Sequence, residues 1–332
     1  MSSEFNTFAT GSERIARQVI ARGMITKLAQ LREAAKAYKK KRMIVAYAAD
    51  SHTIEAAYRA VEAGIVEVTL VGDPEMIRSL CEKSGIDCGV FRIIGEQGDY
   101  ESAARAVRQA ATGEADILMK GTVSTDKYMH AILSKDFGLL PPRSILTHIA
   151  LLEMPGYRKL LLVSDVAVIP QPDLKQKVFM AHSLIQTAHS LGIGCPKVAV
   201  IAPTEQMLPS IPSCVDAAII SKMWERGQIR GGIVDGPLAV DVAINPETVR
   251  IKKLESPVAG DADCMVFPGL DASNTFFKTA TKLAGASMAG MVVGAKVPCI
   301  LTSRGDSEES KLNSIALAVL TTENRPWTHE EA

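Results

Sequence analysis

The feature of this sequence that most constrains its fold is a regular alternation of strand-like and helix-like segments in the N-terminal part of the chain. Short apolar runs rich in β-branched residues occur at Met43–Ala49, Val66–Val71, Phe91–Ile94 and Asp116–Lys120. Segments of helical pattern separate them, at Ser51–Ala63, Pro74–Ser84 and Tyr100–Ala111. This alternation is typical of βαβ units, in which parallel strands form a sheet and helices cover its faces. The sequence therefore predicts an α/β fold.

A second set of strand-like segments follows in the middle of the chain, at Leu160–Val168, Lys197–Ala202, Ala217–Ser221 and Cys264–Phe267. The paired prolines Pro141 and Pro142 stop a helix and stiffen the chain, so they are the best candidate for a hinge. Near the C-terminus, Met288–Thr302 resumes parallel-strand character and could complete the first sheet. We therefore expect a discontinuous α/β domain of residues 1–140 and 291–332, and a second α/β domain of residues 141–290.

The composition favours a cytoplasmic enzyme. With 332 residues, of which 47% are hydrophobic, the chain is long enough for two domains with substantial cores. Positive and negative side chains balance at 37 each, which argues against a nucleic-acid partner bound through bulk charge. No apolar run reaches the length of a membrane span, and the N-terminus shows no signal-peptide hydrophobic region. Six scattered cysteines without C-x-x-C spacing suggest reduced thiols.

The segment Pro298–Lys311 places a strand directly before residues suited to binding an anion. Its first part is apolar, the tripeptide Ser303–Gly305 (Ser-Arg-Gly) follows, and Asp306 opens a predicted helix. Backbone N–H groups and the positive end of a helix dipole attract phosphate at such a point. The guanidinium of Arg304 could hold the phosphate through two parallel hydrogen bonds. The sequence therefore predicts a phosphate site here.

Two other strands end in polar residues. Lys120 ends one of them and is followed by Gly121, Ser124 and Thr125, while Asp165 follows the strand at Leu162. In open α/β sheets, ligands bind outside the carboxyl ends of strands, which favours a binding role for these residues. Ser124 or Thr125 could instead cap the next helix.

Other patterns do not favour a metal ion or a common cofactor. Asp235 and Asp241 bracket a Gly-Pro pair and could serve in metal binding or acid–base chemistry, although stabilisation of a turn is the more frequent role. His182 and His189 lie seven residues apart without a further ligand at suitable spacing. The sequence has no Walker A motif, no G-x-G-x-x-G after a strand and no G-x-S-x-G. Their absence argues against ATP or NAD bound in the common modes and against an α/β-hydrolase.

Five stretches, taken in order, resemble the phosphate acetyltransferase and phosphate butyryltransferase family: MKGTVST, LLLVSDVAVIPQPDLKQK, DGPLAVDVAINPE, SPVAGDADCMVFPGLDASN and LTSRGDSEESK. The resemblance covers Met119 to Lys311. It implies two three-layer α/β domains flanking a cleft, as in the isocitrate and isopropylmalate dehydrogenases. It also implies conversion of acyl-CoA and phosphate into acyl phosphate and CoA, with CoA as a substrate and without a metal or prosthetic group. Family members form homodimers or larger homo-oligomers, and the second domain would carry those contacts.

The resemblance also implies roles for individual residues. Ser303 and Arg304 would hold the acyl phosphate and its developing charge, with the Lys120–Thr125 loop facing them across the cleft. Asn274 and Lys278 match polar positions of the family. The DGPLA stretch, where acetyltransferase members read closer to DGELQ, is similar to the butyryltransferase branch. Butyryl-CoA is therefore the expected substrate, with acetyl-CoA as the alternative.

Two positions depart from the acetyltransferase pattern. The aspartate proposed as the base for the thiol is replaced by Ser310, and a second phosphate-binding arginine is replaced by His130. Asp306 or Glu309 could act as the base, or the two could form a capping box for the helix. Two other functions remain open: a metal- and NAD-dependent dehydrogenase of the related fold, and a CoA-binding protein without catalysis.

Overall fold

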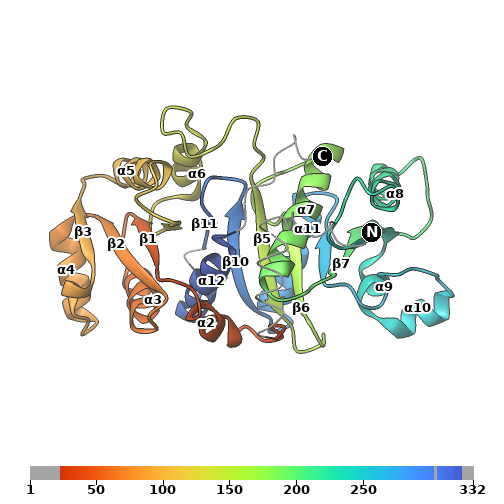
Figure 1. Cartoon of the computed structure of the whole chain (residues 1–332), viewed down its shortest axis with the longest axis horizontal. Helices are drawn as coiled ribbons and strands as arrows, with labels where there is room; N and C mark the ends of the chain where they lie inside the picture. The colour runs from red at the N-terminus through yellow and green to blue at the C-terminus, as the bar shows by residue number, and fades with distance from the viewer. Residues whose placement is uncertain (1–22, 303–304, 324–332) are drawn as a thin grey trace, which may run out of the picture.

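The computed structural model describes residues 23–302 and 305–323. In this part of the chain, eleven strands form one sheet, in the order β3-β2-β1-β4-β11-β10-β5-β6-β9-β7-β8 (Figure 1). The strands are β1 (Lys41–Ala46), β2 (Val66–Gly72), β3 (Arg92–Gly95), β4 (Ile117–Lys120), β5 (Thr147–Glu153), β6 (Leu160–Ser164), β7 (Lys197–Ile201), β8 (Ile233–Leu238), β9 (Cys264–Val266), β10 (Ser287–Val293) and β11 (Cys299–Ile300).

Helices follow most of the strands and cover both faces of the sheet. They are α2 (Gln30–Ala35), α3 (Ser51–Glu62), α4 (Pro74–Lys83), α5 (Asp99–Ala111), α6 (Thr125–Leu133), α7 (Leu174–Ser190), α8 (Pro212–Glu225), α9 (Val240–Ile244), α10 (Pro246–Lys252), α11 (Leu270–Lys282) and α12 (Glu308–Thr321). The alternation predicted from the N-terminal sequence is confirmed, because β1, β2, β3 and β4 are parallel neighbours connected through α3, α4 and α5.

The structure corrects three expectations from the second half of the sequence. Ala217–Ser221 lies within α8, where Cys214, Ala217, Ile220 and Ser221 form a buried stripe at helical spacing. Thr147–Glu153 is a buried strand that the strand-by-strand prediction omitted. Met288–Thr302 contains two strands, and β10 runs antiparallel to both of its neighbours rather than parallel.

Strand direction changes in the middle of the sheet. The strands β1 to β4, β11 and β5 run one way, whereas β10, β6, β9, β7 and β8 run the other way. The pairing register nevertheless brings the carboxyl ends of the two sets together near the centre. One line of paired residues crosses the sheet through Met119, Ile300, Met291, Ile149 and Ser164. The ends of β4 and β6 therefore meet at the same level from opposite directions.

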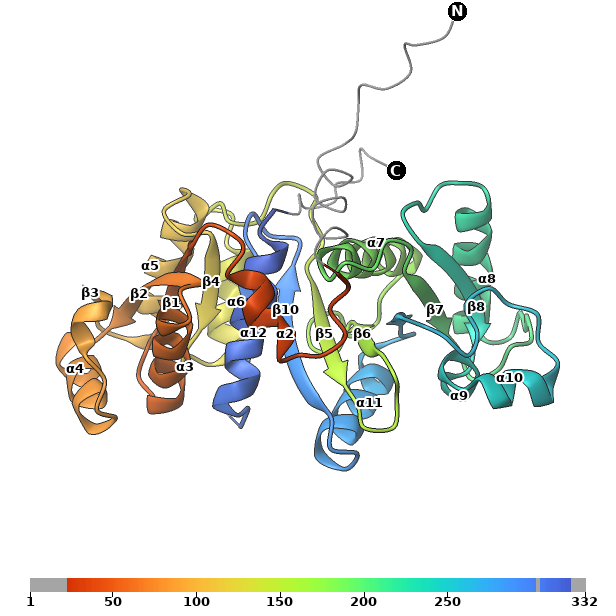
Figure 2. The same cartoon turned by 60° about the horizontal axis from the view of Figure 1, so that its bottom comes forward.

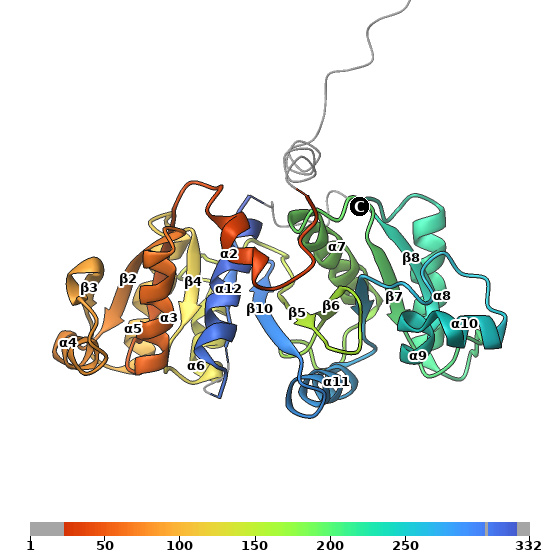
Figure 3. The same ribbon diagram turned by 90° about the horizontal axis from the view of Figure 1, so that it is seen from below.

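The hydrophobic core is continuous on one face of this twisted sheet and divided on the other. On the continuous face, α2, α3, α4, α12, α7 and α8 share one cluster of buried side chains. Figure 3 shows α3, α12 and α7 side by side along this face. On the opposite face, α5 and α6 pack in one cluster, whereas α9 and α11 pack in another.

The C-terminal segment lies within the N-terminal half of the molecule. The strand β11 pairs with β4, and α12 packs against α3 and α2. Figure 2 shows β10 and β5 at the centre, between this half and the helices α8, α9 and α10. The exact division into domains at Pro141 and near residue 290 stays a prediction, since β5 and β10 join both halves in one sheet.

Candidate active site

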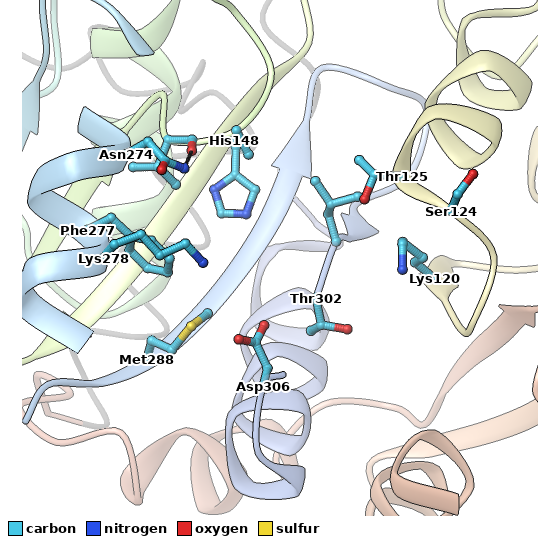
Figure 4. A pocket seen from close by; sticks show the side chains of 13 residues that line it. Lys120, Ser124, Thr125, His148, Asn274, Phe277, Lys278, Met288, Thr302 and Asp306 are labelled. Carbon is cyan, nitrogen blue, oxygen red and sulfur yellow. Dashed lines mark hydrogen bonds between the residues drawn. The ribbon is translucent and has the colours of Figure 1, made fainter. Parts of the chain in front are cut away.

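A cavity of about 480 Å³ lies where the two core clusters of the divided face meet. The ends of β4, β6 and β11 reach it, together with the first turn of α6, one side of α11 and the beginnings of β5 and β10. Its walls are formed by Lys120, Ser124, Thr125, His148, Val166, Ala167, Asn274, Phe277, Lys278, Met288, Leu301, Thr302 and Asp306 (Figure 4). Five of the residues predicted from the sequence to bind substrate are therefore brought together, namely Lys120, Ser124, Thr125, Asn274 and Lys278.

One wall presents an ammonium group and hydroxyl groups. Lys120 is only 3% exposed, and its Nζ donates a hydrogen bond of 3.1 Å to the carbonyl of Gly121. Gly121 does not line the cavity, but a Cβ there would lie 2.2 Å from the carbonyl oxygen of Tyr47. A glycine is therefore required for the chain to turn at Lys120. Ser124 caps α6 by accepting a hydrogen bond of 3.4 Å from the N–H of Lys127, so the capping alternative is confirmed for Ser124.

The opposite wall is formed by α11. Asn274 donates a hydrogen bond of 2.9 Å from Nδ2 to the carbonyl of Val166, which fixes the loop after β6. The Nζ of Lys278 lies 5.3 Å from the centre of the Phe277 ring and points into the cavity (Figure 4). Among the residues described, Lys278 forms no ion pair, so its charge is available to an anionic ligand. The helix begins at Leu270 with Gly269 as its N-cap, so Asn274 lies inside the helix and its side chain does not cap it.

Asp165 is placed behind the cavity wall rather than in it. The residue is 2% exposed, and its Oδ1 accepts hydrogen bonds from the backbone of Ala167 and Val168, at 2.7 and 2.8 Å. Its Oδ2 accepts from the hydroxyl of Thr147 and the backbone N–H of His148, both at 2.9 Å. Four donors saturate this buried carboxylate. Asp165 therefore orders the loop after β6 and the beginning of β5.

The structure separates the two carboxylates proposed as candidate bases. Asp306 lines the cavity, whereas Glu309 lies 3.3 Å from Arg32 and 3.8 Å from Arg59 and does not line it. The capping box proposed for these two residues is wrong, because Ser307 is the N-cap of α12 and accepts a hydrogen bond of 3.2 Å from Ser310. Ser303 and Arg304, the centre of the predicted phosphate site, lie outside the described residues.

A buried ion pair holds α12 in place beside this site. Lys311 is 3% exposed, and its Nζ lies 3.5 Å from Oδ1 of Asp50 and 3.2 Å from the hydroxyl of Thr53. Asp50 caps α3 and accepts a hydrogen bond of 2.9 Å from the hydroxyl of Thr122. Burial alone would raise the pKa of Asp50, but the hydrogen bond from Thr53 and the charge of Lys311 lower it below its usual value. The network ties α12 to α3 and to the loop after β4.

The other residues considered from the sequence lie elsewhere. His130 is exposed on α6, with Nδ1 3.2 Å from the hydroxyl of Tyr100. Asp235 lies within β8 and accepts a hydrogen bond from the N–H of Gly236, so the Gly-Pro pair is part of a strand rather than a turn. Asp241 lies 3.5 Å from Lys252. Within residues 23–302 and 305–323, no group of three or more potential ligands could hold a metal ion.

His148 lines the cavity and was missed by the sequence analysis. It is the second residue of β5 and is 3% exposed. Burial lowers the pKa of its imidazole, although the nearby charge of Asp165 acts in the opposite direction. A single histidine at the start of an apolar run carries no pattern that distinguishes a site residue from a core residue. Its place in the cavity wall is visible only in the folded structure.

Comparison with known proteins identifies the family. Residues 26–109 and 101–319 match the family described as phosphate acetyl/butaryl transferase. The chain belongs to this family. It is 40% identical over 290 residues to the phosphate butyryltransferase of Clostridium acetobutylicum, which covers 87% of this chain and 96% of that protein. It is also 39% identical over 277 residues to the phosphate acetyltransferase of Rhizobium meliloti, which covers 83% of this chain and 87% of the relative.

Solved structures agree with this assignment. The branched-chain phosphotransacylase of Enterococcus faecalis superimposes with a TM-score of 0.74 at 27% identity, over 85% of this chain and 99% of that one. The phosphotransacetylase of Streptococcus pyogenes shares the fold, with a TM-score of 0.75 at 21% identity, over 92% of this chain and 98% of that one. The predicted fold class of two three-layer α/β units flanking a cleft, like the isocitrate and isopropylmalate dehydrogenases, is confirmed.

The chain is therefore an acyltransferase of the phosphate acetyltransferase and phosphate butyryltransferase type. The two kinds of relative are matched at similar identity, so the comparisons leave the acyl group open. In the part of the chain that the structure describes, no helix has both the length and the apolar character to cross a bilayer.

Proposed function

We propose that this chain transfers a short acyl group, with butyryl preferred, between CoA and inorganic phosphate. The observation that carries this proposal is the two-sided cavity. The α11 side carries the apolar side chains of Val166, Phe277 and Met288 beside the polar Asn274 and Lys278, whereas Lys120, Thr125 and Thr302 provide a charge and hydroxyl groups on the other side. An acyl phosphate has the same division, with an alkyl chain at one end and a phosphoryl group at the other. The similarity of DGPLA to the butyryltransferase branch supports the same choice.

The proposed reaction proceeds in a ternary complex without a covalent enzyme intermediate. In the direction of acyl-CoA synthesis, the CoA sulfur attacks the carbonyl carbon of the acyl phosphate, and phosphate leaves. A thiol with a pKa near 8.5 is only a few per cent ionised at pH 7, so a base that favours the thiolate contributes about 2 kcal/mol. Asp306 is the candidate for this base, since it is the acid of the predicted pair that lines the cavity. No metal ion or prosthetic group takes part in the proposal.

The cations of the cavity have the complementary role of stabilising the phosphate. Lys120 lies on the wall proposed for the phosphoryl group, and Lys278 points into the cavity from the α11 wall, so both would approach the phosphoryl oxygens, Lys278 by reaching across from the opposite side. One such donor contributes about 3 kcal/mol to the transition state. Ser303 and Arg304 are proposed to complete this site from the segment between Thr302 and Gly305. Arginine is suited to it because its guanidinium can bind phosphate through two hydrogen bonds.

The test is release of free CoA from a series of acyl-CoAs of two to six carbons, measured with a thiol reagent. We expect release to require phosphate or arsenate and kcat/KM to be highest for butyryl-CoA. Release that does not depend on phosphate across the whole series would refute the proposal. Maximal activity with acetyl-CoA would refute the acyl preference alone.

Shortening Met288 tests whether α11 and β10 contact the acyl chain. Met288 is 6% exposed and lines the cavity, so Met288→Ala extends the apolar side by about three heavy atoms. We expect the ratio of kcat/KM for hexanoyl-CoA to that for butyryl-CoA to rise by about tenfold, since each added methylene in a fitted pocket changes binding by roughly 1–3 kcal/mol. Met207→Ala is the matched control, because Met207 is 71% exposed and lies outside the cavity. An unchanged ratio in Met288→Ala would place the acyl chain elsewhere.

The family resemblance also leads us to propose a homodimer or larger homo-oligomer that binds acyl-CoA and phosphate. The apolar side chains of Val215 and Ile219, 37% and 40% exposed on α8, are consistent with such a contact. Light scattering after size-exclusion chromatography measures the mass directly, and a monomer at micromolar concentration would contradict this proposal.

A further inference from the structure

One carboxylate outside the cavity contacts two segments of the chain that carry cavity residues. The first segment is the loop after β4, in which Lys120 and Thr125 line the cavity. The second is the beginning of α12, which Asp306 precedes. Asp50 follows β1 and is the N-cap of α3, and it does not line the cavity itself. Its side chain is therefore placed to act on the site through its neighbours.

The carboxylate of Asp50 has partners on three elements. Oδ1 accepts a hydrogen bond of 2.8 Å from the backbone N–H of Thr53 and lies 3.5 Å from Nζ of Lys311. Oδ2 accepts from the hydroxyl of Thr53 at 2.7 Å and from the hydroxyl of Thr122 at 2.9 Å. These partners belong to α3, to α12 and to the loop after β4. The position of each element relative to the other two therefore depends on this one side chain.

In the loop after β4, Thr122 lies between the two cavity residues Lys120 and Thr125. The backbone N–H groups of Gly121 and Thr122 donate to carbonyls at the end of β1. The hydroxyl of Thr122 adds an attachment to Asp50, on the side of α3. A loop that is attached through both its backbone and a side chain cannot rotate freely about either attachment. The side chains before and after Thr122 therefore keep their direction into the cavity.

On α12, the buried Lys311 lies five residues after Asp306 and makes the contact with Asp50. The helices α3 and α12 lie side by side (Figure 3) and are also joined by Arg59 and Glu308, at 3.0 Å. The side chain of Arg59 is 49% exposed, so water and salt screen this second pair and its contribution is small. A buried charge that loses its partner is strongly destabilising. The contact between Lys311 and Asp50 therefore determines where α12 begins.

Capping of α3 does not by itself explain a charged pair at this point. Serine or asparagine caps a helix about as well as aspartate, and Ser124 and Ser307 cap α6 and α12 through hydroxyl groups. A buried ion pair such as that of Asp50 and Lys311 is costly to desolvate and often stabilises a fold less than apolar side chains would. Its best-attested effect is to select one arrangement of the segments that it joins. Here those segments carry the cavity residues.

We propose that Asp50 is a positioning residue for acyl transfer, which holds Lys120 and Asp306 at a fixed separation; this role rests on the proposed function above. In the tetrahedral intermediate, the sulfur of CoA and the leaving oxygen of phosphate are bonded to the same carbon. The base for the thiol and the cation for the phosphate must therefore be held in register with each other. Figure 4 shows Lys120, Thr302 and Asp306 along this part of the cavity. A misplacement of about 1 Å between such groups lowers a rate by about 10²-fold.

The experiment compares Thr122→Val, which removes the hydroxyl and keeps the shape, with Thr122→Ser, which keeps the hydroxyl. We expect kcat with butyryl-CoA and phosphate to fall about 30-fold in Thr122→Val, with KM for butyryl-CoA changed less than about threefold, and Thr122→Ser to stay within about threefold of the wild-type kcat. Asp50→Asn retains a good N-cap but lacks the charge, and its kcat should fall at least about tenfold. Asp73→Asn is the matched control, since Asp73 caps α4 and lies outside the cavity.

Two measurements separate positioning from a loss of stability. The kcat values are measured at a temperature at which urea unfolding shows every variant to be folded, where a merely structural role leaves kcat unchanged. In a Lys120→Met background, Thr122→Val should lower kcat by less than about threefold, because the group that it positions is gone. An unchanged kcat in Thr122→Val or Asp50→Asn, an equal loss in Asp73→Asn, or an equal loss in both backgrounds would overturn the proposal. No phosphate-dependent CoA release in the wild type would refute the proposed function and this role with it, whereas an active wild type with unaffected variants refutes the role alone.

Discussion

The best-defined effect of pH on stability concerns His182, on the helix α7. Burial lowers the pKa of this histidine from its usual 6.5 to about 4. The unfolded chain therefore binds a proton near pH 6.5, whereas the folded chain resists protonation until about pH 4. Because the folded pKa is the lower one, the stabilising contribution is complete above pH 7 and is lost as the pH falls from 6.5 towards 4. At pH 5 the expected loss is about 2 kcal/mol, since one pKa unit corresponds to about 1.4 kcal/mol.

Urea unfolding of the wild type and His182→Gln at pH 7.5 and pH 5.0 measures this contribution. His148 and His189 also have pKa values lowered by burial, so the wild type should lose stability in acid for several reasons together. The difference between the two proteins isolates His182, and we expect the wild type to lose about 2 kcal/mol more than the variant. His52→Gln, at an exposed position on α3, is the control and should follow the wild type. Equal losses in the wild type and His182→Gln would refute the reasoning.

Two further changes test how the site is held in place. Gly121→Ala would bring a Cβ to 2.2 Å from the carbonyl oxygen of Tyr47. We therefore expect the free energy of unfolding, measured with urea, to fall by about 3 kcal/mol, and phosphate-dependent CoA release to be lost because Lys120 is displaced. Gly156→Ala is the control in both measurements, because an added Cβ there has open space around it. Lys311→Met should lower the free energy of unfolding by about 3 kcal/mol, because it leaves Asp50 without its cation. The double variant with Asp50→Asn should lose less than the sum of the two single variants, and strict additivity would show that the pair is not coupled.

The N-terminal half of the fold could be predicted from sequence because each of its elements carries a local pattern. The segments between Met43 and Lys120 alternate clearly, and each buries one face against the next. Ala217–Ser221 was mistaken for a strand because a short apolar run fits a strand and a buried helix equally well. The antiparallel direction of β10 could not be predicted, since direction depends on which distant strand it pairs with and not on its own residues.

The sequence analysis found site residues where polar side chains follow the end of a strand. It missed a site residue that lies at the beginning of a strand. Lys120 ends a buried strand and was predicted to bind substrate on that ground, whereas Lys278 was expected only from the family resemblance; both line the cavity. Asp165 looked equally unusual, but its carboxylate accepts hydrogen bonds from backbone N–H groups, which the sequence does not reveal. His148 carried no local signal, because its place in the cavity wall is visible only in the folded structure.

The pairing of β5 with β10 has a consequence for motion in this protein. Seven residue pairs connect these strands, and the uninterrupted core of the opposite face lies behind them. A protein whose halves are linked only by a loop can swing open widely, because a few backbone torsions absorb the rotation. Here the two halves are joined by the hydrogen-bonded pair β5 and β10, so the cavity between them can widen only if these two strands twist. Substrate entry and product release are therefore expected to rely on small displacements around α6, α11 and the beginning of α12.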